Sequence, residues 1–413
     1  MNVVPLPPKL IAIAQWLLLA LLIGVAAGSA SAFFLVSLDW VTKLREQQPE
    51  IIWLLPIGGL FIGLVYHYYG QSIVAGNNLI LQEYEQPKRT IPLKMAPFVL
   101  IGTLITHLFG GSAGREGTAV QMGAAIADQF TRVFKLEAID RKTILIMGIS
   151  GGFAAVFGTP LAGALFALEV VYFSGVRPKS IIWSFITAYV AHYTVLLWSV
   201  SHTHYHIPQV PELSMSVIFW VVGCSVLFGF ASMLFSRSTQ FWSRIFSLVT
   251  YTPLRPFIGG IVIAIVVYAI DTTKYIGLGI PMLTGAFVQA NAIQDFAIKI
   301  LFTSFTLGAG FKGGEVTPLF IVGATLGSAL SVFVPLPIAL LAGLGFVAVF
   351  SGATHTPIAC SVMGIELFGI ESGICIALAC AVAYLFSGPV GIYKSQILGG
   401  PKMKIYHWLQ LKF

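Results

Sequence analysis

Long apolar runs separated by short polar segments form the main pattern of the chain, from Ile11 to Phe386. Because a membrane-spanning helix needs about 20 apolar residues, this length has room for roughly ten to twelve helical segments. The runs are continuous rather than alternating, which favours helices over a membrane β-barrel. The first run, Ile11 to Val36, is too long for the core of a signal peptide and is predicted to be the first span. The pattern therefore predicts an all-α integral membrane protein.

Glycine interrupts these runs, with 42 residues in the chain and pairs such as Gly110-Gly111 and Gly313-Gly314. Such frequent glycines predict many tilted, short and broken helices. At membrane depth, irregular backbone is tolerated where it lines a cavity, and there its N–H and C=O groups can bind ions. The glycine pattern therefore favours transport.

The chain contains an internal repeat. Residues 153–157 (FAAVF) match residues 346–350 (FVAVF), and the Gly-rich segment 114–118 matches 314–318 at an offset of 200. We expect a single membrane domain over residues 1–413, built from two related halves at about 11–200 and 215–400, with no C-terminal soluble domain. Transporters with such repeats place their sites at the interface of the halves, near the middle of the membrane.

Composition supports the membrane assignment. Hydrophobic residues make up 57% of the chain and charged residues 9%, with a mean hydropathy of +0.88, whereas a soluble protein carries about 25% charged residues. A secreted enzyme and a nucleic-acid-binding protein are therefore excluded. The net charge of +7 is assigned to loops rich in Lys and Arg, at 88–94, 132–142 and 402–412. The four cysteines lie inside apolar runs and are predicted to be buried small hydrophobes.

Acidic residues within the apolar runs are the candidates for chemistry, because an ionisable side chain inside the membrane costs at least ~2.5 kcal/mol. Glu116 follows a Gly-rich turn and is predicted to begin a helix. Unpaired N–H groups and the helix dipole attract either an anion or a carboxylate to such a point. An ionised Glu116 can therefore compete with a transported anion and leave the site when protonated. The alternative is an ordinary helix-start acid that pairs with Arg115.

Three further acids occupy positions related by the repeat. Glu315 lies in the second-half turn, where a functional role and a simple ion pair with Lys312 are equally weighted. Glu169 and Glu366 each follow a matched Thr-Pro pair by nine residues from the proline. Their symmetry predicts helix capping or pairing at the interface of the halves for both.

Two weaker motifs suggest other chemistry. Ser150 lies in a G-x-S-x-G segment, which with His192 as a base is typical of a serine hydrolase or an intramembrane serine protease. A contact between helices through small residues explains it more simply. His202, His204 and His206 alternate in a polar linker, a pattern that can bind a metal but is more typical of an exposed loop.

Four segments, in order, resemble motifs of the CLC chloride channels and proton-coupled anion exchangers. Residues 114–118 (GREGT) resemble the family's GREGP, whose glutamate is the external gate, and residues 314–318 (GEVTP) resemble GxFxP. Residues 76–80 (GNNLI) lie where GSGIP belongs, and Tyr393 resembles the tyrosine that closes the inner end of the anion path. The resemblance implies two inverted halves and one anion path in each subunit of a homodimer, spanning the inner (plasma) membrane of the cell.

Three departures from these motifs narrow the resemblance: Asn77 replaces the central serine, Thr118 the proline and Val316 the phenylalanine. This combination resembles the bacterial CLC-F branch, whose members are fluoride/proton antiporters that protect the cytoplasm from fluoride. The resemblance implies no cofactor, metal or catalytic residue, and fluoride and protons as substrates; a chloride channel or chloride/proton exchanger is the alternative. It assigns gating and proton coupling to Glu116, a second coupling role to Glu315, and anion contacts to Asn77, Gly117, Val316, Thr317 and Tyr393.

The chemistry of fluoride is compatible with these residues. Fluoride is small, tightly hydrated and a strong hydrogen-bond acceptor, so compact amide, hydroxyl and backbone donors are needed to replace its water. Chloride is not excluded by this argument alone. Chloride exchangers relay protons through a second acid near the inner surface, yet no Asp or Glu occurs between Glu169 and Glu212. Proton coupling must therefore rest on Glu116, with Glu315 as a candidate assistant.

Overall fold

The computed structural model describes residues 8–171, 176–397 and 402, which form α-helices and short 3-10 helices joined by turns. The expected tail beyond Tyr393 lies outside the described residues from 398 onward, Lys402 excepted. Sixteen α-helices are present in the described ranges: α1 (Pro8–Gln47), α2 (Leu55–Tyr69), α3 (Asn77–Glu85), α4 (Met95–Leu108), α5 (Glu116–Val133), α6 (Ala138–Phe157), α7 (Pro160–Val170), α8 (Pro178–Leu197), α9 (Met215–Ser247), α10 (Leu254–Ile270), α11 (Ile280–Gly285), α12 (Asp295–Gly308), α13 (Val316–Leu330), α14 (Ile338–Thr354), α15 (Pro357–Phe368) and α16 (Gly373–Phe386).

The all-α prediction is confirmed, but the expected number of helices was too low. Many segments are shorter than a full span; α7 has 11 residues and α11 has 6. Four helical stretches are long and apolar enough to cross a membrane by length and composition: 9–47, 49–69, 178–197 and 215–247. The predicted first span is confirmed as part of α1, which is longer than expected, at 40 residues.

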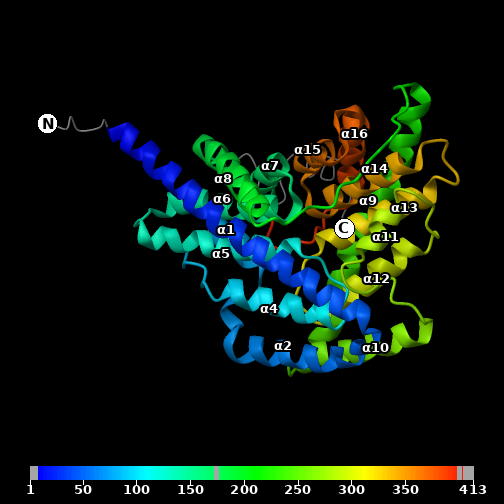
Figure 1. Cartoon of the computed structure of the whole chain (residues 1–413), viewed down its shortest axis with the longest axis horizontal. Coiled ribbons are helices and arrows are strands. Elements are labelled where there is room, and N and C mark those ends of the chain that lie inside the picture. The colour runs from blue at the N-terminus through cyan, green and yellow to red at the C-terminus, as the bar shows by residue number, and fades with distance from the viewer. Residues whose placement is uncertain (1–7, 172–175, 398–401, 403–413) are drawn as a thin grey trace.

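The helices form two groups that meet in the middle of the molecule (Figure 1). The long helix α1 runs across one group and packs against α8, α6, α5 and α4. The second group contains α9, α12, α13, α14 and α16, which pack against one another. Helices α2 and α10 lie together along one edge of the view. The groups touch through α7 and α15 and through the turns before α5 and α13.

Glycine allows close helix packing at the same place in both groups. A Cβ atom added at Gly123 on α5 would lie 2.3 Å from the Gly148 carbonyl oxygen on α6. At the matching Gly323 on α13, an added Cβ would lie 1.9 Å from the Gly345 carbonyl oxygen on α14. Because any side chain there would overlap the neighbouring backbone, glycine sets how closely the helices approach.

Glu169 and Glu366 cap each other's helices. Glu169, near the end of α7, accepts hydrogen bonds from the Ile358 and Ala359 N–H groups at the start of α15, at 3.1 and 2.8 Å. Glu366 on α15 accepts from the Leu161 and Ala162 N–H groups of α7, at 3.0 and 2.7 Å. The structure confirms the prediction of capping, since each carboxylate accepts hydrogen bonds from N–H groups that would otherwise be unpaired at a helix start.

Candidate functional site

Two paired turns bring the starts of α5 and α13 together. The Gly114 N–H donates to the Gly314 carbonyl at 2.6 Å, and the Gly314 N–H donates to the Gly114 carbonyl at 2.7 Å. The two turns are the segments that the sequence repeat matched. Because each turn leads directly into a helix, the positive ends of two helix dipoles converge at this point.

The Glu116 carboxylate reaches from the start of α5 to the start of α13. One oxygen, Oε2, accepts from the Thr317 N–H at 3.0 Å and from the Arg115 N–H at 3.1 Å. The other, Oε1, accepts a hydrogen bond from the Thr317 hydroxyl and lies 3.6 Å from Arg115 Nε. Glu116 is only 1% exposed. Pairing with Arg115 is thus present, but the Thr317 donors on the other helix group are the closer partners.

Asn77 adds a third helix start to the site, since it is the first residue of α3. A Cβ atom added at Gly117 would lie 3.1 Å from Asn77 Nδ2 and 3.2 Å from Gly314 Cα. Asn77 Oδ1 is buried without a hydrogen-bond partner among the residues that the structure describes. Glycine at 117 therefore leaves the space in which the Asn77 amide and the two paired turns meet.

The remaining predicted residues surround this point. Val316 is the first residue of α13 and is buried, and Glu315 precedes it. Glu315 Oε2 would lie 3.9 Å from a Cβ at Gly117. Tyr393 is buried and lines the same small pocket as Asn77. The structure thus gathers Glu116, Asn77, Gly117, Val316, Thr317, Glu315 and Tyr393 in one region.

Two cavities lie near this region of the structure. The Arg115 cavity, about 520 Å³, is lined by Arg115, Arg45 and Lys274 among others. The Tyr393 cavity, about 140 Å³, is lined by Tyr393, Asn77, Glu315 and other residues. Arg115 and Gly117 flank Glu116 in the chain and face the first cavity and Asn77, respectively. Glu116 thus lies in the chain between a residue that lines the Arg115 cavity and a residue beside Asn77, which lines the Tyr393 cavity.

Two buried cations near the turn of residues 110–115 were missed in the sequence. Lys299, fully buried on α12, donates to Ser112 Oγ at 2.9 Å and to the Tyr275 carbonyl at 3.0 Å. Arg45 near the end of α1 donates to the His107 carbonyl at 3.4 Å. The sequence does contain a signal for Lys299. A charged side chain inside an apolar run is costly whether it is an acid or a base, so the lysine is also a candidate functional residue.

The segment that carries Tyr393 is hydrogen-bonded to α3, a contact that the sequence motifs do not predict. The Ser395 N–H donates to Asn78 Oδ1 at 2.9 Å, and Gln82 Nε2 donates to Ser395 Oγ at 2.9 Å. Asn78 directly follows Asn77. The two asparagines of GNNLI therefore have different contacts: Asn77 lies beside Gly117, and Asn78 accepts a hydrogen bond from the Tyr393 segment.

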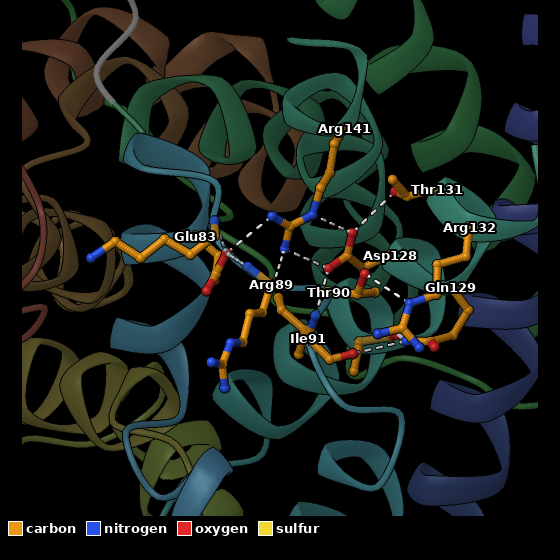
Figure 2. Close-up of polar contacts among 11 residues, drawn as sticks. Glu83, Arg89, Thr90, Ile91, Asp128, Gln129, Thr131, Arg132 and Arg141 are labelled. Atoms are coloured by element: carbon orange, nitrogen blue, oxygen red, sulfur yellow. Dashed lines mark hydrogen bonds and ion pairs between the residues drawn. The ribbon is translucent and has the colours of Figure 1, made fainter. Parts of the chain in front are cut away.

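The far end of α3 is held by a buried ion cluster centred on Arg141 of α6, shown in Figure 2. Arg141 Nη2 lies 2.7 Å from Asp128 Oδ2 on α5, and Arg141 Nη1 lies 3.0 Å from Glu83 Oε2 on α3. Asp128 also accepts from the Ile91 N–H at 2.7 Å. Arg141 thus joins α3 and α5, the two helices that begin with Asn77 and Glu116.

The structure does not support the two weaker motifs. Ser150 is fully buried, and its hydroxyl donates to the Met147 and Ser184 carbonyls at 2.9 and 3.2 Å. No hydrogen bond joins it to His192 within the described ranges. His202 contacts the Ala155 carbonyl at 2.9 Å, and the described residues contain no group of three His, Cys, Asp or Glu suited to a metal. The helix-contact interpretation of Ser150 fits these contacts.

Comparison with known proteins gives a consistent result. The family model described as a voltage-gated chloride channel matches residues 58–388. The chain is 51% identical over 397 residues to the chloride/fluoride channel protein of Pseudomonas syringae pv. tomato, covering 94% of this chain and 88% of that protein. It is 27% identical to the H(+)/Cl(−) exchange transporter ClcA of Vibrio vulnificus, covering 85% of this chain and 81% of that one.

Solved structures agree with the fold. The crystal structure of a CLC-type fluoride/proton antiporter matches with a TM-score of 0.90 at 34% identity, covering 93% of this chain and 98% of that one. A slow cyanobacterial Cl−/H+ antiporter matches with a TM-score of 0.80 at 17% identity, covering 94% and 97%, and supports the fold alone.

Proposed function

This chain belongs to the voltage-gated chloride channel family, and we propose that it is a fluoride/proton antiporter that exports fluoride from the cytoplasm. Glu116 is the gate: it alternates between the anion site and a protonated position outside it. Asn77, Gly117, Val316, Thr317 and Tyr393 line the path of the anion. Glu315 assists proton coupling as a second acid.

One observation carries the proposal: the Glu116 carboxylate, at the start of α5, accepts hydrogen bonds from donors at the start of α13. Its oxygens accept from the Thr317 N–H and hydroxyl, which are the kind of donors that bind an anion. A carboxylate in an anion site is displaced either by an anion or by protonation, which removes its negative charge. Anion entry and proton uptake both require the Glu116 side chain to leave the site. The movement of this one group therefore couples the two fluxes.

Fluoride rather than chloride is favoured by the donors and by the relatives. An amide at Asn77 and a hydroxyl at Thr317 supply compact donors for a small, strongly hydrated ion. The Pseudomonas relative is named a chloride/fluoride channel protein, and the matching crystal structure at 34% identity is a fluoride/proton antiporter. Chloride is the second candidate, because the Vibrio relative is named an H(+)/Cl(−) exchange transporter.

The assembly and location are part of the proposal. We place the protein in the plasma membrane as a homodimer with one path in each subunit, and we propose that its two halves are inverted relative to one another. The repeat-related contacts support the last point: Glu169 and Glu366 exchange equivalent caps, and the Gly114 and Gly314 turns exchange equivalent hydrogen bonds.

Replacing the gate tests this function. In Glu116→Gln the side chain carries no charge at any pH, so it cannot take up a proton as it moves. We expect fluoride to move down its gradient while fluoride-driven uphill proton transport is lost. Both fluxes are measured on the purified protein in liposomes, with a fluoride electrode and a proton-sensitive dye. Undiminished coupled exchange in Glu116→Gln contradicts the role of Glu116.

A further inference from the structure

We propose that Lys312 forms an anion-loading site in the Tyr393 cavity, where the transported anion is held before it passes Asn77 and Tyr393. The inference rests on the proposed function, and it adds a binding residue from outside the matched motifs. Lys312 is the only cation among the described residues that line this cavity, and Glu315 is the only acid.

The fold positions the Lys312 side chain without neutralising it. A Cβ atom added at Gly102 on α4 would lie 2.9 Å from Lys312 Cγ, so the stem of the lysine packs against this helix. The ammonium nitrogen lies 4.1 Å from the centroid of the Tyr66 ring, which also lines the cavity. A cation over an aromatic face is held in place while it keeps its positive charge. The site therefore retains a charge that an anion can use.

Glu315 does not cancel this charge through direct contact. The expected ion pair between Lys312 and Glu315 is absent from the described part of the chain, although the two residues are three apart in sequence. The two charges therefore act on the cavity from separate places on its wall. An anion can approach the ammonium without first breaking an ion pair.

The other polar groups of the wall suit a partly hydrated small anion. Gln121 and Asn77 contribute amide groups, and Gln121 Nε2 lies 3.2 Å from the position of a Cβ on Gly76, directly before α3. A volume of about 140 Å³ exceeds the ~30 Å³ that one water occupies in the liquid, so the anion can enter with several waters. The Lys312 charge raises the local anion concentration, and the amides replace part of the water.

Removing the Lys312 charge tests the site. In Lys312→Met we expect the half-saturating fluoride concentration for transport to rise roughly fivefold to tenfold, with the maximal rate within about twofold of the original. Lys312→Arg keeps the charge and should stay close to the unmodified protein. Lys94→Met is the matched control, since it removes one exposed lysine that does not line the cavity. Initial fluoride efflux is measured in liposomes over a series of fluoride concentrations.

The outcomes separate this inference from the proposed function. If the unmodified protein drives protons with fluoride but Lys312→Met behaves like Lys94→Met, the loading site is wrong and the antiporter stands. If the unmodified protein moves no protons with fluoride, the proposed function itself fails.

Discussion

Thr317→Val tests how firmly Glu116, the proposed gate, is held in the proposed anion site. Valine keeps the shape of threonine and the backbone N–H that donates to Glu116 Oε2 at 3.0 Å, but it removes the hydroxyl that donates to Oε1. A hydrogen bond to a charged group contributes about 1.5–3 kcal/mol. The ratio of molecules with the Glu116 carboxylate inside the site to molecules with it outside should therefore fall by about 10- to 150-fold.

A double-mutant cycle isolates this effect from any direct contact between the hydroxyl and fluoride. Fluoride binding is measured by titration calorimetry for the unmodified protein, Thr317→Val, Glu116→Gln and the double variant. Because fluoride must displace the carboxylate, Thr317→Val should weaken fluoride binding less in the presence of Glu116 than in Glu116→Gln, where the hydroxyl contacts fluoride alone. The expected coupling energy is about 1.5–3 kcal/mol. Thr317→Ser, which keeps the hydroxyl, should behave like the unmodified protein.

Additive effects of the two substitutions refute the reasoning. They would mean that the Thr317 hydroxyl does not hold the carboxylate, and that the gate is retained by backbone donors alone.

Three further predictions concern the residues around α3. Asn77→Ser should reduce the preference for fluoride over chloride in paired efflux measurements, because the hydroxyl offers one donor where the amide offers two; an unchanged preference argues against Asn77 as a selectivity residue. Asn78→Leu removes the acceptor of the Ser395 N–H, a loss of about 1 kcal/mol that should loosen the Tyr393 segment. We expect fewer protons moved per fluoride in this variant, whereas Asn78→Asp keeps the acceptor and should keep the coupling. Arg141→Leu leaves two buried carboxylates without their ion-pair partner and should destabilise the purified protein by about 3–5 kcal/mol in a thermal unfolding assay. The control Arg132→Leu removes an exposed arginine and should cost about 0–1 kcal/mol in the same assay.

The sequence predicted the helical membrane fold but not the lengths of its helices. Apolar runs identify where the chain is buried in lipid or protein, and the long helices α1 and α9 contain such runs. They do not fix where a helix stops inside such a run. Pro160 starts α7 and Thr356-Pro357 starts α15, so local backbone restrictions rather than hydropathy set these boundaries.

The sequence suggested candidate site residues, which the structure places in one region, but it revealed only part of how they interact. The repeat identified Glu116 and Thr317 as members of matched turns, because a residue pattern is preserved in each half. It did not reveal that the Glu116 carboxylate reaches the donors of Thr317 in the other half. Such a contact depends on how the halves dock, which no local pattern encodes.

Residues far from the motifs were harder to find. Closeness in the chain suggests Glu315 as the ion-pair partner of Lys312, yet the Lys312 ammonium lies over the Tyr66 ring. Its place in the segment 132–142 assigns Arg141 to the charged loops, although its buried side chain pairs with Asp128 and Glu83. In both cases the partner comes from a distant segment, and the pairing follows from tertiary packing.

Simultaneous measurement of anion and proton flux tests the central claim most directly. The purified protein is reconstituted into liposomes with the membrane potential clamped, and these are loaded with fluoride in one set and chloride in another. The account predicts fluoride efflux far above chloride efflux, with protons driven uphill into the liposomes by the outward fluoride gradient. Comparable chloride efflux, or rapid fluoride efflux without proton movement, would contradict a fluoride/proton antiporter.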